Sequence, residues 1–165
     1  MLGKRIVALG DILGFTRTVL ANPADRVIAG PLQFLRNALE HSMNHAGWPV
    51  AVPTLAQLQS NPIVGFAWFS DTILLFARED TERANTAVVE TAAWLLHETM
   101  HAPRSQMRFA IDYDELYVDE SNGIYVGKAV VHTAQLEKEQ EWSGGALTDE
   151  AAQRISNTGA SEIHY

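Results

Sequence analysis

Two apolar segments that each lead to an aspartate constrain the fold of this chain more than any other feature. Residues 4–10 form a short apolar run that predicts a buried strand, and this run ends at Asp11. Residues 63–77 predict two apolar strands joined by a tight turn that carries Asp71. Two carboxylates on adjacent strand ends can share hard cations such as Mg²⁺. The sequence therefore predicts a cation site between them.

The residues after Asp11 predict an anion site beside this cation site. Residues 12–16, Ile-Leu-Gly-Phe-Thr, turn from the strand into a predicted helix. Backbone amides at a helix start, together with the helix dipole, favour a bound anion. A carboxylate followed by such amides suits a metal-bound polyphosphate.

Length and composition limit the function classes. The 165 residues predict one domain, 1–165, and 47% hydrophobic residues are enough for a core. A formal net charge of −8 argues against nucleic acid or an anionic membrane as a partner. There is no cysteine, which excludes disulfides and thiolate chemistry. The first apolar run is too short for a signal peptide or a membrane span, so a cytoplasmic protein is expected.

The order of predicted elements, β-α-α-β-β-α-β-β-α, indicates an α+β fold. Helices are expected at 31–47, 80–102 and 127–141, and an Asn-Gly turn joins strands 116–118 and 124–126. Residues 163–165 are a predicted edge strand. Such an order predicts a mixed, mostly antiparallel sheet with helices packed on one side.

Three blocks of sequence together resemble the class III nucleotide cyclase family, the catalytic domain of adenylate and guanylate cyclases. The first is LGDILGFT at 9–16, and the second is the hairpin with its Ser-Asp turn. The third consists of MRFAIDY at 107–113, IYVGKA at 124–129, Leu-Glu at 136–137 and Trp-Ser-Gly at 142–144. The blocks follow the order of the family over residues 4–150. The most similar subgroup resembles the bacterial uridylate and cytidylate cyclases of anti-phage signalling.

The resemblance implies a ferredoxin-like core and a two-metal reaction. Such an enzyme converts a nucleoside triphosphate into a 3′,5′-cyclic nucleotide and pyrophosphate with two Mg²⁺ or Mn²⁺ ions. One metal activates the ribose 3′-hydroxyl and the other orients the triphosphate. The implied metal ligands are Asp11, Asp71 and the backbone carbonyl of Ile12. The implied phosphate-binding amides are those of Gly14, Phe15 and Thr16.

The family builds its site between two subunits, which implies a homodimer. The metal-binding acids come from one subunit, and an Asn and an Arg on a late helix come from the other. Val131 stands here where the Asn belongs, and Gln135 stands where the Arg belongs. Lys138, one turn beyond Gln135, is a candidate replacement for the catalytic cation. The competing interpretation of Lys138 is a solvated surface lysine.

The residues that select a purine base in adenylate cyclases are also different. Ala67 replaces the lysine four positions before the second aspartate, and Asn122 falls near the paired acidic position. Small Ala67 next to bulky Trp68 and Phe69 indicates a different base pocket, or none.

Two alternatives stay open. The chain is either an active cyclase or a degenerate cyclase fold that binds only a nucleotide or a partner. A third, minor hypothesis is a zinc hydrolase, because residues 97–101 read His-Glu-Thr-Met-His. Since both imidazoles lie on the helix face away from its predicted buried stripe, we expect His97 and His101 to be exposed and to bind no zinc.

Overall fold

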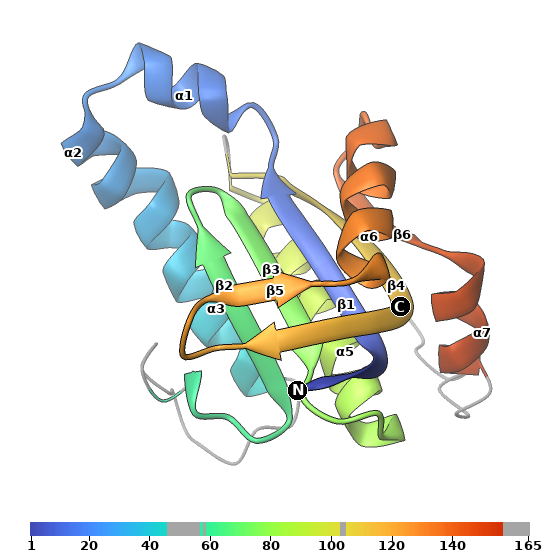
Figure 1. Ribbon diagram of the computed structural model, residues 1–165. Coiled ribbons are helices and arrows are strands. Elements are labelled where there is room, and N and C mark those ends of the chain that lie inside the picture. Colours follow the sequence, from blue (N-terminus) through green and yellow to red (C-terminus); the bar gives the residue numbers. More distant parts are fainter. Residues whose placement is uncertain (46–56, 58, 103–104, 157–165) are drawn as a thin grey trace.

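A six-stranded sheet forms the centre of the computed structural model, which describes residues 1–45, 57, 59–102 and 105–156 (Figure 1). Five strands follow the order β2-β3-β1-β4-β5, and β6 pairs with β4. Their bounds are β1 (Leu2–Ile12), β2 (Val64–Phe69), β3 (Thr72–Ala77), β4 (Met107–Asp119), β5 (Ile124–Val126) and β6 (Gly144–Leu147). The β4–β6 pair is parallel and the other pairs are antiparallel. The predicted α+β class with a mixed, mostly antiparallel sheet is confirmed.

Helices cover both faces of this sheet, whereas the sequence predicted helices on one side. The helical segments are α1 (Phe15–Ala21), α2 (Ala24–Val27), the π-helical turn η1 (Ile28–Leu32), α3 (Gln33–His45), α5 (Glu82–Met100), α6 (Lys128–Glu139) and α7 (Asp149–Ser156). Helices α3 and α5 pack together behind the sheet in Figure 1, and α6 lies across β1 and β4 in front of it.

The alternation of side chains along β1 explains why helices pack on both faces of the sheet. Ile6 and Ala8 point into the larger core, which α3 and α5 complete. Val7 points to the opposite face, where it packs in a second cluster with Ala129 of α6. An uninterrupted apolar run therefore marks a strand that is buried on both sides.

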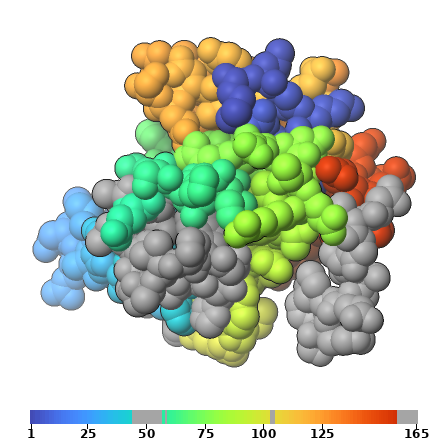
Figure 2. Space-filling model, turned by 90° about the horizontal axis from the view of Figure 1, so that it is seen from below, coloured from blue at the N-terminus to red at the C-terminus, as the bar shows by residue number. Residues whose placement is uncertain are grey.

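The longest ladder of the sheet sets the register of the functional residues. Strand β1 pairs with β4 from Leu2 opposite Tyr117 to Ile12 opposite Met107. The amino group of Met1 donates a hydrogen bond to the carbonyl of Val118 at 2.9 Å. Figure 2 shows these first residues, in blue, beside the orange β4–β5 hairpin. The same ladder places Arg108 opposite Asp11.

Gly127 lets the start of α6 approach β4 closely. A Cβ atom added there would lie 2.1 Å from the carbonyl oxygen of Glu115, so the position has no room for a side chain.

No helix in the described part of the chain is long and apolar enough to cross a membrane. The predicted edge strand at 163–165 lies outside the described residues.

Candidate functional site

The sheet brings the two predicted acids together. Asp11 is the next-to-last residue of β1, and Asp71 lies in the turn between β2 and β3. Because β1 pairs with β3, with Gly10 opposite Ile73, the strand end and the turn lie side by side. The Asp11 carboxyl is within hydrogen-bonding reach of Asp71, and the Thr72 hydroxyl donates to Asp11 Oδ1 at 3.4 Å.

The backbone of the β2–β3 turn holds Asp71 in place. Ser70 has a φ of 57°, in the left-handed region that few residues other than glycine adopt. The indole Nε1 of Trp68 donates to the Ser70 carbonyl oxygen at 2.6 Å. This bond closes the turn from its outer side.

The electrostatics of this acid pair favour a bound cation. Burial, then the negative charge of Asp71, the hydrogen bond with it and the charge of Glu137 raise the pKa of Asp11 to about 7, while Arg108 acts in the opposite direction. Two adjacent carboxyls that would otherwise repel each other need either a shared proton or a positive ion. Oxygen ligands of this kind fit Mg²⁺ or Mn²⁺. The residues present therefore fit the expected metals.

Arg108 and Glu137 belong to this site, and the sequence analysis missed both. Arg108 on β4 lies 3.6 Å from Asp11 through Nη2 and Oδ2. It also forms an ion pair with Glu137 of α6 and donates to the Gln140 carbonyl. Glu137 is only 7% exposed, which is unusual for a glutamate. The sequence signal for Arg108 is a lone arginine within the apolar segment 107–111.

The predicted α6 residues face solvent rather than this acid pair. Val131, Gln135 and Lys138 are exposed and follow one another at spacings of four and three, so they share one side of the helix. Buried Thr133 and Glu137 lie on the side that faces the sheet. Within one subunit, Glu137 is therefore the α6 residue next to Asp11.

The predicted phosphate-binding segment forms a helix start as expected. Ile12 is buried at the end of β1, and Gly14 is the N-cap residue of α1 with a φ of 73°. Phe15 anchors the segment in the core, and Thr16 is exposed. The first amides of a helix have no partner within it, so they can contact an anion.

Two of the candidate base-binding residues line a cavity of about 690 Å³ between the β2–β3 hairpin and β5. Ala67 and Phe69 line it together with Tyr125, and Thr72 connects it to Asp11. Asn122 lies in the β4–β5 turn, where its side-chain amide donates to Asp119 Oδ2 at 2.8 Å.

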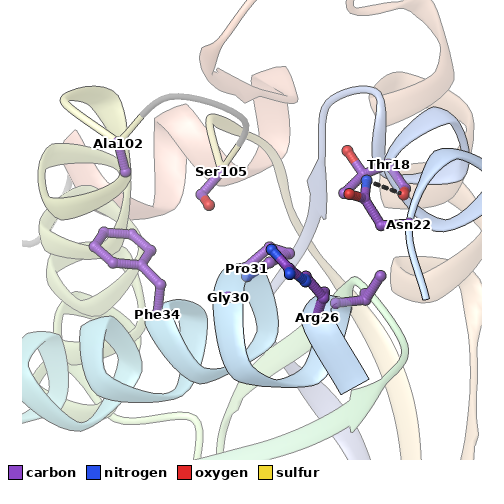
Figure 3. A pocket seen from close by; sticks show the side chains of 9 residues that line it. Thr18, Asn22, Arg26, Gly30, Pro31, Phe34, Ala102 and Ser105 are labelled. Atoms are coloured by element: carbon purple, nitrogen blue, oxygen red, sulfur yellow. Dashed lines mark hydrogen bonds between the residues drawn. The ribbon is translucent and has the colours of Figure 1, made fainter. Parts of the chain in front are cut away.

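A second hollow borders α1 (Figure 3). It has a volume of about 410 Å³ and extends from α1 and α2 to the end of α5. Arg26 supplies the charged side chain of its lining, and Asn22 Nδ2 donates to the Thr18 carbonyl at 2.8 Å. Its described lining residues include neither of the two acids.

The two histidines of the HExxH segment are exposed, as predicted. The ring of His97 packs edge-on against those of Trp94 and His101. Glu98 pairs with His41 of α3, at 3.1 Å between Oε1 and Nδ1. The glutamate that a zinc hydrolase would use as a base is thus bound to another imidazole.

Comparison with solved structures identifies the fold class. A rhodopsin-guanylyl cyclase catalytic core with converted specificity, in complex with ATPαS, matches with a TM-score of 0.72 and 14% identity over 94% of this chain and 82% of that one. The non-canonical dimeric guanylyl cyclase domain of a RhoGC fusion protein from Blastocladiella emersonii matches with a TM-score of 0.70 and 13% identity, over 95% and 86%. A class III adenylyl cyclase-like ATP-binding protein from Pseudomonas aeruginosa matches with a TM-score of 0.59 and 12% identity, over 99% and 38%.

The chain therefore has the fold of the class III nucleotide cyclase catalytic domain. No protein-family model and no curated protein sequence matches it. At such low identities the likeness establishes the architecture, and the chemistry has to be argued from the residues of this chain.

Proposed function

We propose that this protein is a nucleotide cyclase, a single domain that converts a nucleoside triphosphate into a 3′,5′-cyclic nucleotide and pyrophosphate. The observation that carries the proposal is the close pair of Asp11 and Asp71, with the raised pKa of Asp11, at adjoining strand ends of a cyclase fold. Both acids are the residues that the sequence resemblance selects as metal ligands.

The residues of this chain would divide the work between holding cations and holding the substrate. Two Mg²⁺ or Mn²⁺ ions on Asp11, Asp71 and the Ile12 carbonyl would neutralise the triphosphate and acidify the ribose 3′-hydroxyl. In the reaction, the 3′-oxygen would give its proton to solvent water and bond to the α-phosphorus as the bond to the bridging oxygen breaks and pyrophosphate leaves. Amides of Gly14, Phe15 and Thr16 would hold phosphate oxygens.

Among the described residues, Arg108 is the cationic side chain that forms an ion pair with Asp11. It lies between Asp11 and Glu137 and offsets part of their repulsion. We propose that it fixes the position of Asp11, which makes it a positioning residue rather than a direct replacement for the late-helix arginine.

The exposed side of α6 favours a homodimer. Val131, Gln135 and Lys138 face away from the acids of their own subunit, and late-helix residues of the family act in the site of the partner. In a second copy, the same three residues would meet the acid pair across the interface. A similar guanylyl cyclase domain is dimeric.

The choice of base depends on the cavity beside Ala67. Because the side chain of Ala67 has no polar atom, it cannot recognise a purine as a lysine at that position would. The resemblance to uridylate and cytidylate cyclases favours a pyrimidine, which is smaller, and aromatic Phe69 and Tyr125 could stack on it. We propose UTP or CTP as the substrate.

A binding-only domain is the second candidate. The absence of the family's Asn and Arg at Val131 and Gln135 favours it, and one protein of similar fold is an ATP-binding protein.

Incubation with each of the four nucleoside triphosphates and Mn²⁺ or Mg²⁺, followed by mass spectrometry, tests the proposal. We expect one triphosphate, UTP or CTP, to give cyclic nucleotide and pyrophosphate in equal amounts. Metal-dependent binding of a triphosphate without product would select the binding-only domain. Neither product nor binding would reject both.

The raised pKa of Asp11 predicts how metal affinity depends on pH. Below about pH 7 a cation must displace a proton from the acid pair, so its apparent affinity should fall about tenfold per pH unit. Above pH 7 the affinity should be nearly constant. Calorimetric titration with Mg²⁺ between pH 5.5 and 8.5 measures this profile, and a flat profile would contradict the assignment of Asp11 as a ligand.

A further inference from the structure

We propose that Asp112, Asp114 and His132 form a second divalent-metal site, separate from the Asp11–Asp71 pair. One ligand atom from each of the three residues lies within 4.8 Å of the other two. Among the described residues, no other group of three carboxylate or imidazole side chains comes this close. None of the three was among the site residues predicted from the sequence.

Two elements bring the three side chains together. Asp112 and Asp114 are two residues apart on β4, so both point to the sheet face under α6. His132 lies on α6 above them. His132 Nδ1 is 3.0 Å from Asp112 Oδ2 and 4.0 Å from Asp114 Oδ2.

These separations are close to what a bound ion needs. With metal–ligand bonds of about 2.1 Å at near-tetrahedral or octahedral angles, neighbouring donor atoms lie ~3.0–3.5 Å apart. The Asp112–His132 pair already has this spacing. The Asp114 oxygen lies farther out, within 4.8 Å of the other two ligand atoms, and a side-chain rotation can bring it closer.

Both carboxylates are already oriented by hydrogen bonds to their other oxygen. The Thr148 hydroxyl donates to Asp112 Oδ1 at 2.5 Å, and the Glu115 amide donates to Asp114 Oδ1 at 2.8 Å. The Oδ2 atom of each residue is thereby directed toward His132. Outer hydrogen bonds that orient ligands in this way are a regular feature of metal sites in proteins.

Burial and charge give the group a reason to take up a cation. Asp112 is 1% exposed, and a buried carboxylate is costly unless a positive charge or hydrogen bonds compensate it. The Nζ atom of Lys4 lies 4.0 Å from Asp114 Oδ1. The other oxygen, Oδ2, faces His132 and is the one available to a metal ion. One imidazole with two carboxylates suits Zn²⁺ or Mn²⁺ better than Ca²⁺ or Mg²⁺, which prefer oxygen ligands alone.

The site would connect the sheet to α6. Asp112 follows Arg108 by four residues on β4, which places the group about 13 Å from the Asp11 end of the strand. His132 is next to Val131, the first of the three α6 residues that the resemblance selects. A bound ion would therefore fix the first turns of α6 on β4 without touching the acid pair.

Calorimetric titration with Zn²⁺ tests the proposal in a background that lacks the other site. In the double variant Asp11→Asn with Asp71→Asn, we expect one Zn²⁺ per chain. Adding His132→Ala should weaken this binding by about 100-fold or more, beyond the 10–100-fold typical of losing an outer-shell partner. Adding Asp114→Asn should weaken it as well. Co²⁺ reports the same site through its ligand-field absorption in the visible range, which should change when His132 is removed.

The matched control is His97→Ala, which removes an exposed imidazole from α5 outside the group. Binding should survive this change. The proposal is rejected if the double variant binds no Zn²⁺, because Asp112 and His132 are then only an ion pair. Loss of binding in His97→Ala but not in His132→Ala would also reject it and would place the ion at the HExxH segment. Circular dichroism checks that every variant is folded. Failure of the cyclase assay leaves this result unaffected.

Discussion

Replacing Asp11 or Asp71 by asparagine is expected to lower the production of cyclic nucleotide by about 10³-fold or more. Each change keeps the shape of the side chain but removes a full negative charge from the cation site. A neutral amide binds Mg²⁺ much more weakly than a carboxylate does, and charge stabilisation supplies most of the catalysis of phosphoryl transfer. Turnover measured with saturating Mn²⁺ and substrate tests the expectation. Asp25→Asn, on the exposed surface of α2, is the matched control.

Measuring Tm shows whether these variants are inactive because a metal ligand is missing or because the protein is unfolded. The folded-state pKa of Asp11 is raised to about 7, so the native state gains stability from the proton below pH 4 and loses it as pH rises through 7. Without metal at pH 8, Asp11→Asn should therefore be more stable than the wild type. After allowance for solvent screening we expect a gain of about 1 kcal/mol, or ~2–4 °C in Tm. Inactivity together with a lower Tm would instead indicate damage to the fold.

The second large effect is expected for Arg108→Ala. This change leaves Glu137 buried without its ion-pair partner and removes the charge that offsets the repulsion around Asp11. Removing one partner of a buried ion pair costs about 3–5 kcal/mol. Because Arg108 is partly exposed, we expect Arg108→Ala to lower the free energy of unfolding by ~3 kcal/mol. Urea unfolding in the absence of metal measures this change.

A double-mutant cycle identifies the cause of this loss. Glu137→Gln removes the uncompensated charge, so it should restore about 1–2 kcal/mol in the Arg108→Ala background. Arg108→Lys should retain part of the stability because it keeps the charge but loses the forked geometry. If the effects of Arg108→Ala and Glu137→Gln are simply additive, the ion pair does not carry the stability that we assign to it.

The sequence predicts the parts of the site that depend on local patterns. Asp11 and Asp71 each follow an apolar strand, and strand ends that are neighbours in a sheet bring such residues together. The helix start at Gly14 follows from the turn after β1. The fold class follows from the order of the elements, because hairpins and crossovers leave few arrangements.

The parts that escaped prediction depend on register and on which face of an element is buried. Arg108 reaches Asp11 because β4 pairs with β1 in one particular register, which no local pattern specifies. On α6, the buried face could not be read from its weak apolar pattern, so Glu137 was overlooked. Helix α6 packs on the front of the sheet because it covers Val7 there. That Val7 is buried on this face becomes evident only when both strands beside β1 are known.

Crystals grown with Mn²⁺ and a triphosphate whose α–β bridge cannot be cleaved test the central claim most directly. Anomalous scattering at the manganese edge locates the ions directly. The account predicts Mn²⁺ between the carboxylates of Asp11 and Asp71, with the triphosphate against the amides of residues 14–16. A triphosphate bound elsewhere, with no manganese at the acid pair, would contradict it.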